Sequence, residues 1–254
     1  MLKLLADSVR TYIETARLIL IFGFLVFAVV LFLTNFSTYV VAGAGFLKYS
    51  SILDGTVSLL DLSVFLVISL LSLFCLAFLS VGVTMVVKLK QSLDDVEFFK
   101  LIARFPKHLI KLMVWWMIIG IITFFLALSF NAINAPPWFS ALIMLFLWAF
   151  FIFIPQSLVL HEKDFFPALK DSATYCIKRP GAILVYYVLS CFLLFVLVCI
   201  DVLFGQFFSG DFSLSWIAAI INSALLFIVF IPFLEIVKAN VFVTRYGLLT
   251  LGLK

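Results

Sequence analysis

The chain has 254 residues, of which 66% are hydrophobic and 12% are charged, and its mean hydropathy is +1.30. Soluble domains carry about 45–50% apolar and about 25% charged residues. This composition excludes a water-soluble enzyme and indicates a protein whose solvent is mostly the bilayer. The net charge of +4 is small, so the placement of the bases is more informative than their number.

The first 17 residues predict an amphipathic helix at about residues 2–17. Charged residues recur there every three or four positions and fall on one face: Lys3, Asp7, Arg10, Glu14 and Arg17. Acids are interleaved with bases and no apolar core segment precedes a cleavage site, so the segment is not a signal peptide. It fits a helix lying at the membrane surface, and equally a solvated helix packed on the protein itself.

Six apolar runs follow, each long enough to cross a hydrocarbon core of about 30 Å as a helix. Because the runs are continuous rather than alternating, they predict helices and not a barrel. The expected fold is therefore an all-α, polytopic transmembrane bundle in a single domain, 1–254. The expected spans are 18–39, 62–87, 112–133, 138–160, 182–204 and 214–237.

The distribution of lysine and arginine predicts the orientation. Sixteen of the 17 bases precede the first run, separate the second from the third or the fourth from the fifth, or follow the sixth; the exception is Lys48. By the positive-inside rule, both termini then lie in the cytoplasm. The chain is expected to be a multi-pass protein of the plasma membrane.

Two further amphipathic helices are expected on the cytoplasmic side, at about 92–109 and 164–178. Residues 92–95 have the form of a capping box, and Asp164 can cap a helix that carries Pro167 in its first turn. Pro180, in the sequence Arg-Pro-Gly, ends the second helix before the next span. Weak internal similarities suggest three units, each with an interfacial helix followed by two spans.

Ionisable and strongly polar side chains are rare within the apolar runs. Glu235 lies near the inner end of the last run, within one turn of Lys238, and is expected to pair with it rather than to relay protons. Asn222 is expected to join helices. With Gln156, Asn222 and Glu235 form a candidate intramembrane polar site.

Two prolines, Pro155 and Pro232, are predicted to bend their helices near the inner surface. Gln156 and Ser157 directly follow the first of them. We expect these two side chains to satisfy the backbone carbonyl that this proline leaves without a donor.

No arrangement of residues supports catalysis or a metal site. The four cysteines have no metal-ligand spacing, and there is no Ser/His/Asp set, no phosphate-binding glycine loop and no paired carboxylate. We therefore expect no metal and no cofactor. The bases beside the membrane are expected to contact anionic lipid headgroups, or only to fix the topology. Those of interest are Lys170, Lys178, Arg179, Lys100, Arg104 and Lys107.

The segment IPQSLVLHEKDFFPALKDSATYCIKRPG resembles a loose family of prokaryotic polytopic membrane proteins that includes the membrane domain of glycerophosphodiester phosphodiesterases. The matching positions are Pro155, Glu162, Ala168, Leu169 and Ser172. The resemblance implies a polytopic helical fold and no catalysis, because a separate soluble domain performs hydrolysis in those enzymes.

Three functional hypotheses remain. The first is a non-enzymatic membrane protein that contacts lipid, or supports a protein partner or a second copy, through its cytoplasmic helices; no nucleic acid is expected. The second is the permease subunit of an ABC-type exporter. The third and weaker one is a lipid-modifying enzyme, in which His161, Glu162 or Glu235 would be needed for turnover.

Overall fold

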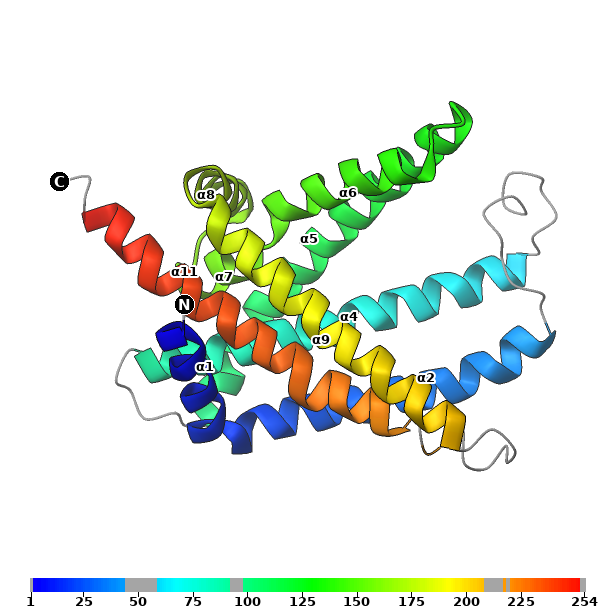
Figure 1. The fold of residues 1–254 in the computed structure, drawn as a ribbon, viewed down its shortest axis with the longest axis horizontal. Helices are drawn as coiled ribbons and strands as arrows, with labels where there is room; N and C mark the ends of the chain where they lie inside the picture. Colours follow the sequence, from blue (N-terminus) through cyan, green and yellow to red (C-terminus); the bar gives the residue numbers. More distant parts are fainter. Residues whose placement is uncertain (1, 44–58, 92–97, 208–216, 218–219, 252–254) are drawn as a thin grey trace.

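The computed structural model describes residues 2–43, 59–91, 98–207, 217 and 220–251. Every regular element within these ranges is a helix, which confirms the all-α fold (Figure 1). The elements are α1 (Leu2–Glu14), α2 (Ala16–Gly43), α4 (Leu59–Gln91), α5 (Phe98–Ala132), α6 (Pro137–Phe151), α7 (Ile154–Leu160), α8 (Phe165–Lys178), α9 (Pro180–Phe207), the π-helical turn η1 (Leu225–Phe230) and α11 (Ile231–Leu251).

Five of these helical stretches are long and apolar enough to cross a membrane, and a sixth is added if α1 and α2 count as one bent span. The angle between those two helices is 79°. The five stretches are Leu70–Lys90, Ala103–Phe130, Trp138–Leu160, Ile183–Ile200 and Ile220–Val243. Five of the six apolar runs predicted from the sequence correspond to these stretches, and the first run lies in α2.

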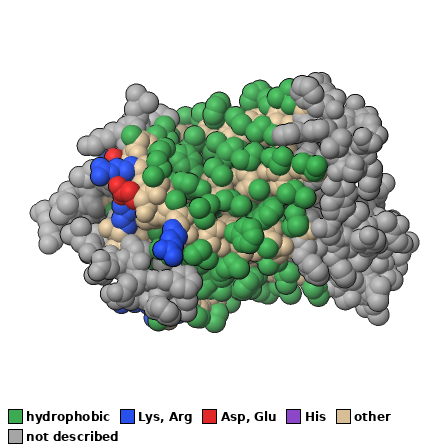
Figure 2. Space-filling view, turned by 90° about the horizontal axis from the view of Figure 1, so that it is seen from below, with side chains coloured by type: hydrophobic (Ala, Val, Ile, Leu, Met, Phe, Trp, Pro, Cys, Tyr) green, Lys and Arg blue, Asp and Glu red, His purple; other side chains and the backbone are tan. Residues whose placement is uncertain are grey.

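The long helices run side by side from one end of the molecule and spread apart toward the other (Figure 1). α1, α7 and α8 gather at the first end, and α1 and α8 lie across the long axis of the bundle. A space-filling view places charged side chains at this end and hydrophobic side chains over the middle (Figure 2). We call the end with α1, α7 and α8 the basic end.

The expectation of a separate surface helix at about 92–109 is corrected by the structure. From Phe98 onward these residues form the first turns of α5, a single helix of 35 residues. Pro106 lies inside this helix but its side chain is exposed, and no second helix breaker lies beside it. The predicted capping box at 92–95 lies outside the described residues, as does Lys48.

The other predicted surface helix is present as α8. Asp164 occupies its N-cap position but makes no capping hydrogen bond with its side chain; its carboxylate pairs instead with Lys111 of α5. α8 ends at Lys178 and α9 begins at Pro180, as expected from the Arg-Pro-Gly sequence. The proline in the first position of α9 costs no hydrogen bond, because that N–H has no helical partner.

α4 is the central helix of the bundle. In Leu70–Lys90, 61% of the most apolar 18-residue stretch is buried inside the protein. The corresponding share in Ile183–Ile200 is 6%. α4 packs against α2, α5, α7 and α11. Polar side chains on its buried face are therefore enclosed by protein rather than by lipid.

Candidate functional site

Four polar side chains from three helices meet in the interior of the bundle. Glu235 accepts hydrogen bonds at Oε2 from Ser80 Oγ of α4 (3.1 Å) and Gln156 Nε2 of α7 (3.0 Å). Lys238 Nζ lies 2.5 Å from Glu235 Oε1, one turn along α11. All four residues are more than nine-tenths buried. We call Ser80, Gln156, Glu235 and Lys238 the polar cluster.

Local sequence explains how these side chains reach one another. α7 begins at Ile154 after a two-residue break in the fourth span, with Pro155 in its first turn, and Gln156 then reaches α11. Glu235 and Lys238 are three residues apart and so lie on one face of α11. The Lys238 ammonium also lies 5.6 Å from the ring centroid of Tyr186 on α9, a cation–π contact.

Two buried oxygen atoms near this cluster have no hydrogen-bond partner in the described part of the chain. They are Oε1 of Gln156 and Oγ1 of Thr84, which lies one turn after Ser80 on α4. Leaving such atoms unpaired costs about 1–3 kcal/mol each. Among the described residues no group of three potential metal ligands occurs. The polar cluster therefore joins α4, α7 and α11 through buried hydrogen bonds and one ion pair, and the two unpaired oxygens beside it reduce the stability of the fold.

The cluster brings together two of the three residues expected at an intramembrane polar site. Gln156 and Glu235 are 79 positions apart in sequence but bonded. Asn222 does not join them: it precedes Glu235 by 13 residues, or about 20 Å along a helix. Sequence reasoning missed Ser80 and Thr84, whose only signal was polar residues at an i, i+4 spacing in an apolar run.

The expected role of Gln156 and Ser157 at the helix break is wrong. Gln156 donates to Glu235, and Ser157 Oγ bonds to Asp171 Oδ2 at 3.1 Å. Two carbonyls near the end of α6, those of Ala149 and Phe150, accept hydrogen bonds from side chains of α8. Ser172 Oγ donates to the Phe150 carbonyl at 2.5 Å, because α8 lies across this break.

Cys176 of α8 contributes to the same junction. Its thiol donates to the Ala149 carbonyl at 3.0 Å. Burial raises the pKa of this thiol to about 11, so it remains protonated and keeps its donor. α8 is thus attached to the fourth span by side chains of its buried face, which leaves its opposite face available.

Ion pairs connect the helices at the basic end. Lys88 of α4 bonds to Glu162 Oε1 at 2.7 Å and to the Val159 carbonyl at 2.9 Å. This hydrogen bond and charge lower the pKa of Glu162, and Lys111 lowers the pKa of Asp164 in the same way. These lysines are therefore committed to acids of the protein itself.

The outer face of α8 carries bases without such partners. Lys170, Lys178 and Arg179 are exposed and make no ion pair with an acid that the structure describes. Phe166 and Ile177, with 76% and 71% of their surface exposed, lie on the same side of the helix as Lys170, whereas Lys178 is the last residue of α8 and Arg179 directly follows it. We call these five residues the basic stripe.

The other bases expected to contact headgroups lie on α5. Arg104 and Lys107 are both exposed, next to the acids of the connection between α7 and α8. The side chain of Lys100 is outside the described part. The basic stripe is therefore the clearest group of solvent-facing bases.

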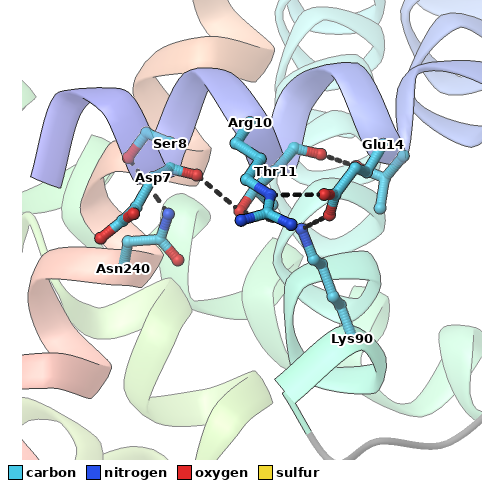
Figure 3. Close-up of polar contacts among 8 residues, drawn as sticks. Asp7, Ser8, Arg10, Thr11, Glu14, Lys90 and Asn240 are labelled. Atoms are coloured by element: carbon cyan, nitrogen blue, oxygen red, sulfur yellow. Dashed lines mark hydrogen bonds and ion pairs between the residues drawn. The ribbon is translucent and has the colours of Figure 1, made fainter. Parts of the chain in front are cut away.

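α1 is fastened to two helices of the bundle (Figure 3). Glu14 binds Lys90 of α4 and also pairs with Arg10 at 2.7 Å. Nearer the start of α1, Ser8 Oγ accepts a hydrogen bond of 3.1 Å from Asn240 Nδ2 of α11. α1 thus bridges the central helix and the last one at the basic end.

These features define the class: an all-α protein with five or six helices able to span a membrane, fitting a multi-pass membrane protein. Comparison with known proteins does not narrow this class further. No family model, no curated protein and no solved structure matches the chain. The function of the chain must therefore be inferred from its own residues and their contacts.

Proposed function

We propose that this chain is a non-enzymatic, multi-pass protein of the plasma membrane whose α8 binds anionic lipid headgroups at the cytoplasmic leaflet. The observation that carries the proposal is the basic stripe. Lys170 and Lys178 on α8, and Arg179 directly after it, are exposed together with two apolar side chains of this helix, which lies across the bundle axis at the end of the spans. Such a face buries apolar tips among acyl chains and keeps cations at headgroup level.

The pairing of the other lysines supports this proposal. Lys88, Lys111 and Lys163 each form an ion pair with an acid of the protein, so a carboxylate largely neutralises the charge of each. The bases of the stripe have no such compensation among described residues. A base beside an anionic membrane surface contributes about 1 kcal/mol of attraction. A relation to the membrane domain of glycerophosphodiester phosphodiesterases fits such a lipid-contacting role and is part of the proposal.

The orientation is tested by labelling single cysteines in a cysteine-free background in intact cells. A cysteine at position 48 should react with an impermeant thiol reagent added outside. Cysteines at positions 92 and 170 should react only after permeabilisation, because the positive-inside rule puts the basic end in the cytoplasm. External labelling at position 170 would reverse the proposed orientation.

The lipid proposal is tested with the triple variant K170Q/K178Q/R179Q in proteoliposomes. Brominated phosphatidylglycerol and brominated phosphatidylcholine serve as quenchers of tryptophan fluorescence. The reporter is a single tryptophan at position 166, where the native side chain is 76% exposed on α8, in a background whose five native tryptophans are replaced by phenylalanine. We expect the wild-type preference for the anionic lipid to fall on the order of 100-fold in the variant, as three attractions of about 1 kcal/mol are lost.

The matched control is K170R/K178R/R179K, which keeps all three charges and should keep the preference. An unchanged preference in the Gln variant would leave these bases as topology signals only. An equal loss in both variants would point to altered packing of α8 rather than to charge.

A further inference from the structure

The last span contains a defect in its backbone hydrogen bonding. In η1 the helix has π geometry, and the N–H of Ile231 bonds to the carbonyl of Leu226, five residues back. Pro232 follows directly and has no N–H. The carbonyls that would pair with residue 232 are those of Ile228 in an α-helix and Phe227 in a π-helix, and this donor is missing for both.

Two neighbouring helices, α1 and α2, contact Phe227 and Ile228. The Tyr12 hydroxyl of α1 donates to the Ile228 carbonyl at 2.9 Å, across 216 positions in sequence. On α2, Gly23 lies so close that an added Cβ would stand 2.9 Å from the Phe227 carbonyl oxygen and 3.0 Å from Ile228 Cα. The π-turn is therefore held by a side chain of α1 and by the backbone of α2.

The polar cluster begins just beyond this turn. Glu235 is three residues after Pro232, and its bonds to Ser80 and Gln156 fix the rotation of α11 against α4 and α7. A π-turn holds one residue more than an α-turn, so its conversion shifts the following residues by one position. That step is about 100° of rotation and 1.5 Å of rise. Glu235 would then leave its two partners.

α1 is suited to control this step because part of it faces outward. Val9 and Ile13 are 45% and 67% exposed, and Arg10 is exposed beside them. On its inner side α1 is held by the bond from Asn240 and by the ion pair between Glu14 and Lys90 (Figure 3). A change in the seating of α1 at the surface would move Tyr12 away from Ile228.

We propose that α1 is a latch: through Tyr12 it holds the last span in its π-helical form, and with it the polar cluster in its bonded arrangement. Release of the latch lets the turn relax toward an α-helix and withdraws Glu235 from Ser80 and Gln156. This inference is independent of the lipid contact proposed for α8.

The test is hydrogen exchange of the full-length protein in nanodiscs, comparing wild type with Y12F, which removes one oxygen atom. We expect amides of 225–240 to exchange at least 10-fold faster in Y12F, while those of the buried part of α4 change little. The matched control is Y175F, which also removes a hydroxyl that donates to a carbonyl of α11, that of Val241 at 3.1 Å, nine residues after Pro232. Y175F should leave 225–236 unchanged.

A double variant separates a latch from a simple contact. Tyr12 donates to Ile228 whereas Glu235 bonds to Ser80, Gln156 and Lys238, so the two residues have no hydrogen-bond partner in common. Independent effects on exchange at 225–240 of Y12F and of Q156L, which removes a donor to Glu235, would therefore multiply. We expect the double variant to fall well short of that product, because both changes release the same turn. A product of the two effects, or faster exchange confined to α1, would overturn the proposal.

Discussion

Replacing Lys238 with methionine is expected to destabilise the folded protein by about 3–5 kcal/mol. The change keeps most of the side-chain volume but leaves the Glu235 carboxylate buried without its cation. The two neutral donors that remain, Ser80 and Gln156, cannot neutralise the charge. The cation–π contact with Tyr186 is lost as well. In detergent, the apparent unfolding temperature followed by tryptophan fluorescence should fall by on the order of 10 °C.

The double variant E235Q/K238M should recover most of this loss. A glutamine at 235 still offers an oxygen to Ser80 and Gln156, and no charge remains buried; replacing a whole buried ion pair is often nearly neutral. The matched control is K170M, which removes a lysine from the exposed face of α8 and should cost less than about 0.5 kcal/mol. A K238M variant as stable as K170M would show that the pair contributes nothing to the fold.

The fold was largely predictable because the bilayer imposes its own length on every apolar run. The pairing of Glu235 with Lys238 was also predictable, since helical spacing alone places them together. The prediction of a separate surface helix at 92–109 was wrong, because the residues between it and the next apolar run, 110–111, contain no glycine or proline, and α5 continues through them.

The partners of the polar cluster were not predictable from local pattern. Gln156 was recognised as polar, but its bond to Glu235 depends on how α7 is rotated against α11 after the break at Pro155. Pro232 predicted a bend, yet the π-turn before it and the hydroxyl of Tyr12 on Ile228 require a packing partner 216 positions away. Periodicity shows which face of a helix is polar and leaves open which helix will meet it.

The close packing of Gly23 on α2 against η1 leads to the second prediction of a large loss of stability. We expect Gly23→Ala to destabilise the protein by about 1–3 kcal/mol, the usual range for overpacking. The added methyl group would lie 2.9 Å from the Phe227 carbonyl oxygen and 3.0 Å from Ile228 Cα. Both are backbone atoms, so no side-chain rotation can relieve the clash, and α2 must move away from η1. The apparent unfolding temperature should fall by several degrees, and exchange at 225–240 should rise.

Two other glycines provide controls for this prediction. At Gly82 an added Cβ would lie 2.7 Å from the buried ring of Phe22, which packs against Phe78 and Phe105, so Gly82→Ala should also cost about 1–3 kcal/mol, but at a site away from η1. At Gly120 in α5 nothing lies within 4 Å, and Gly120→Ala should be neutral or stabilising by up to about 1 kcal/mol, because alanine is the better helix former. Gly120→Ala should be the most stable of the three variants, and only Gly23→Ala should raise exchange at 225–240. A Gly23→Ala variant as stable as Gly120→Ala would mean that α2 does not press on the π-turn, and the turn would then depend on Tyr12 alone.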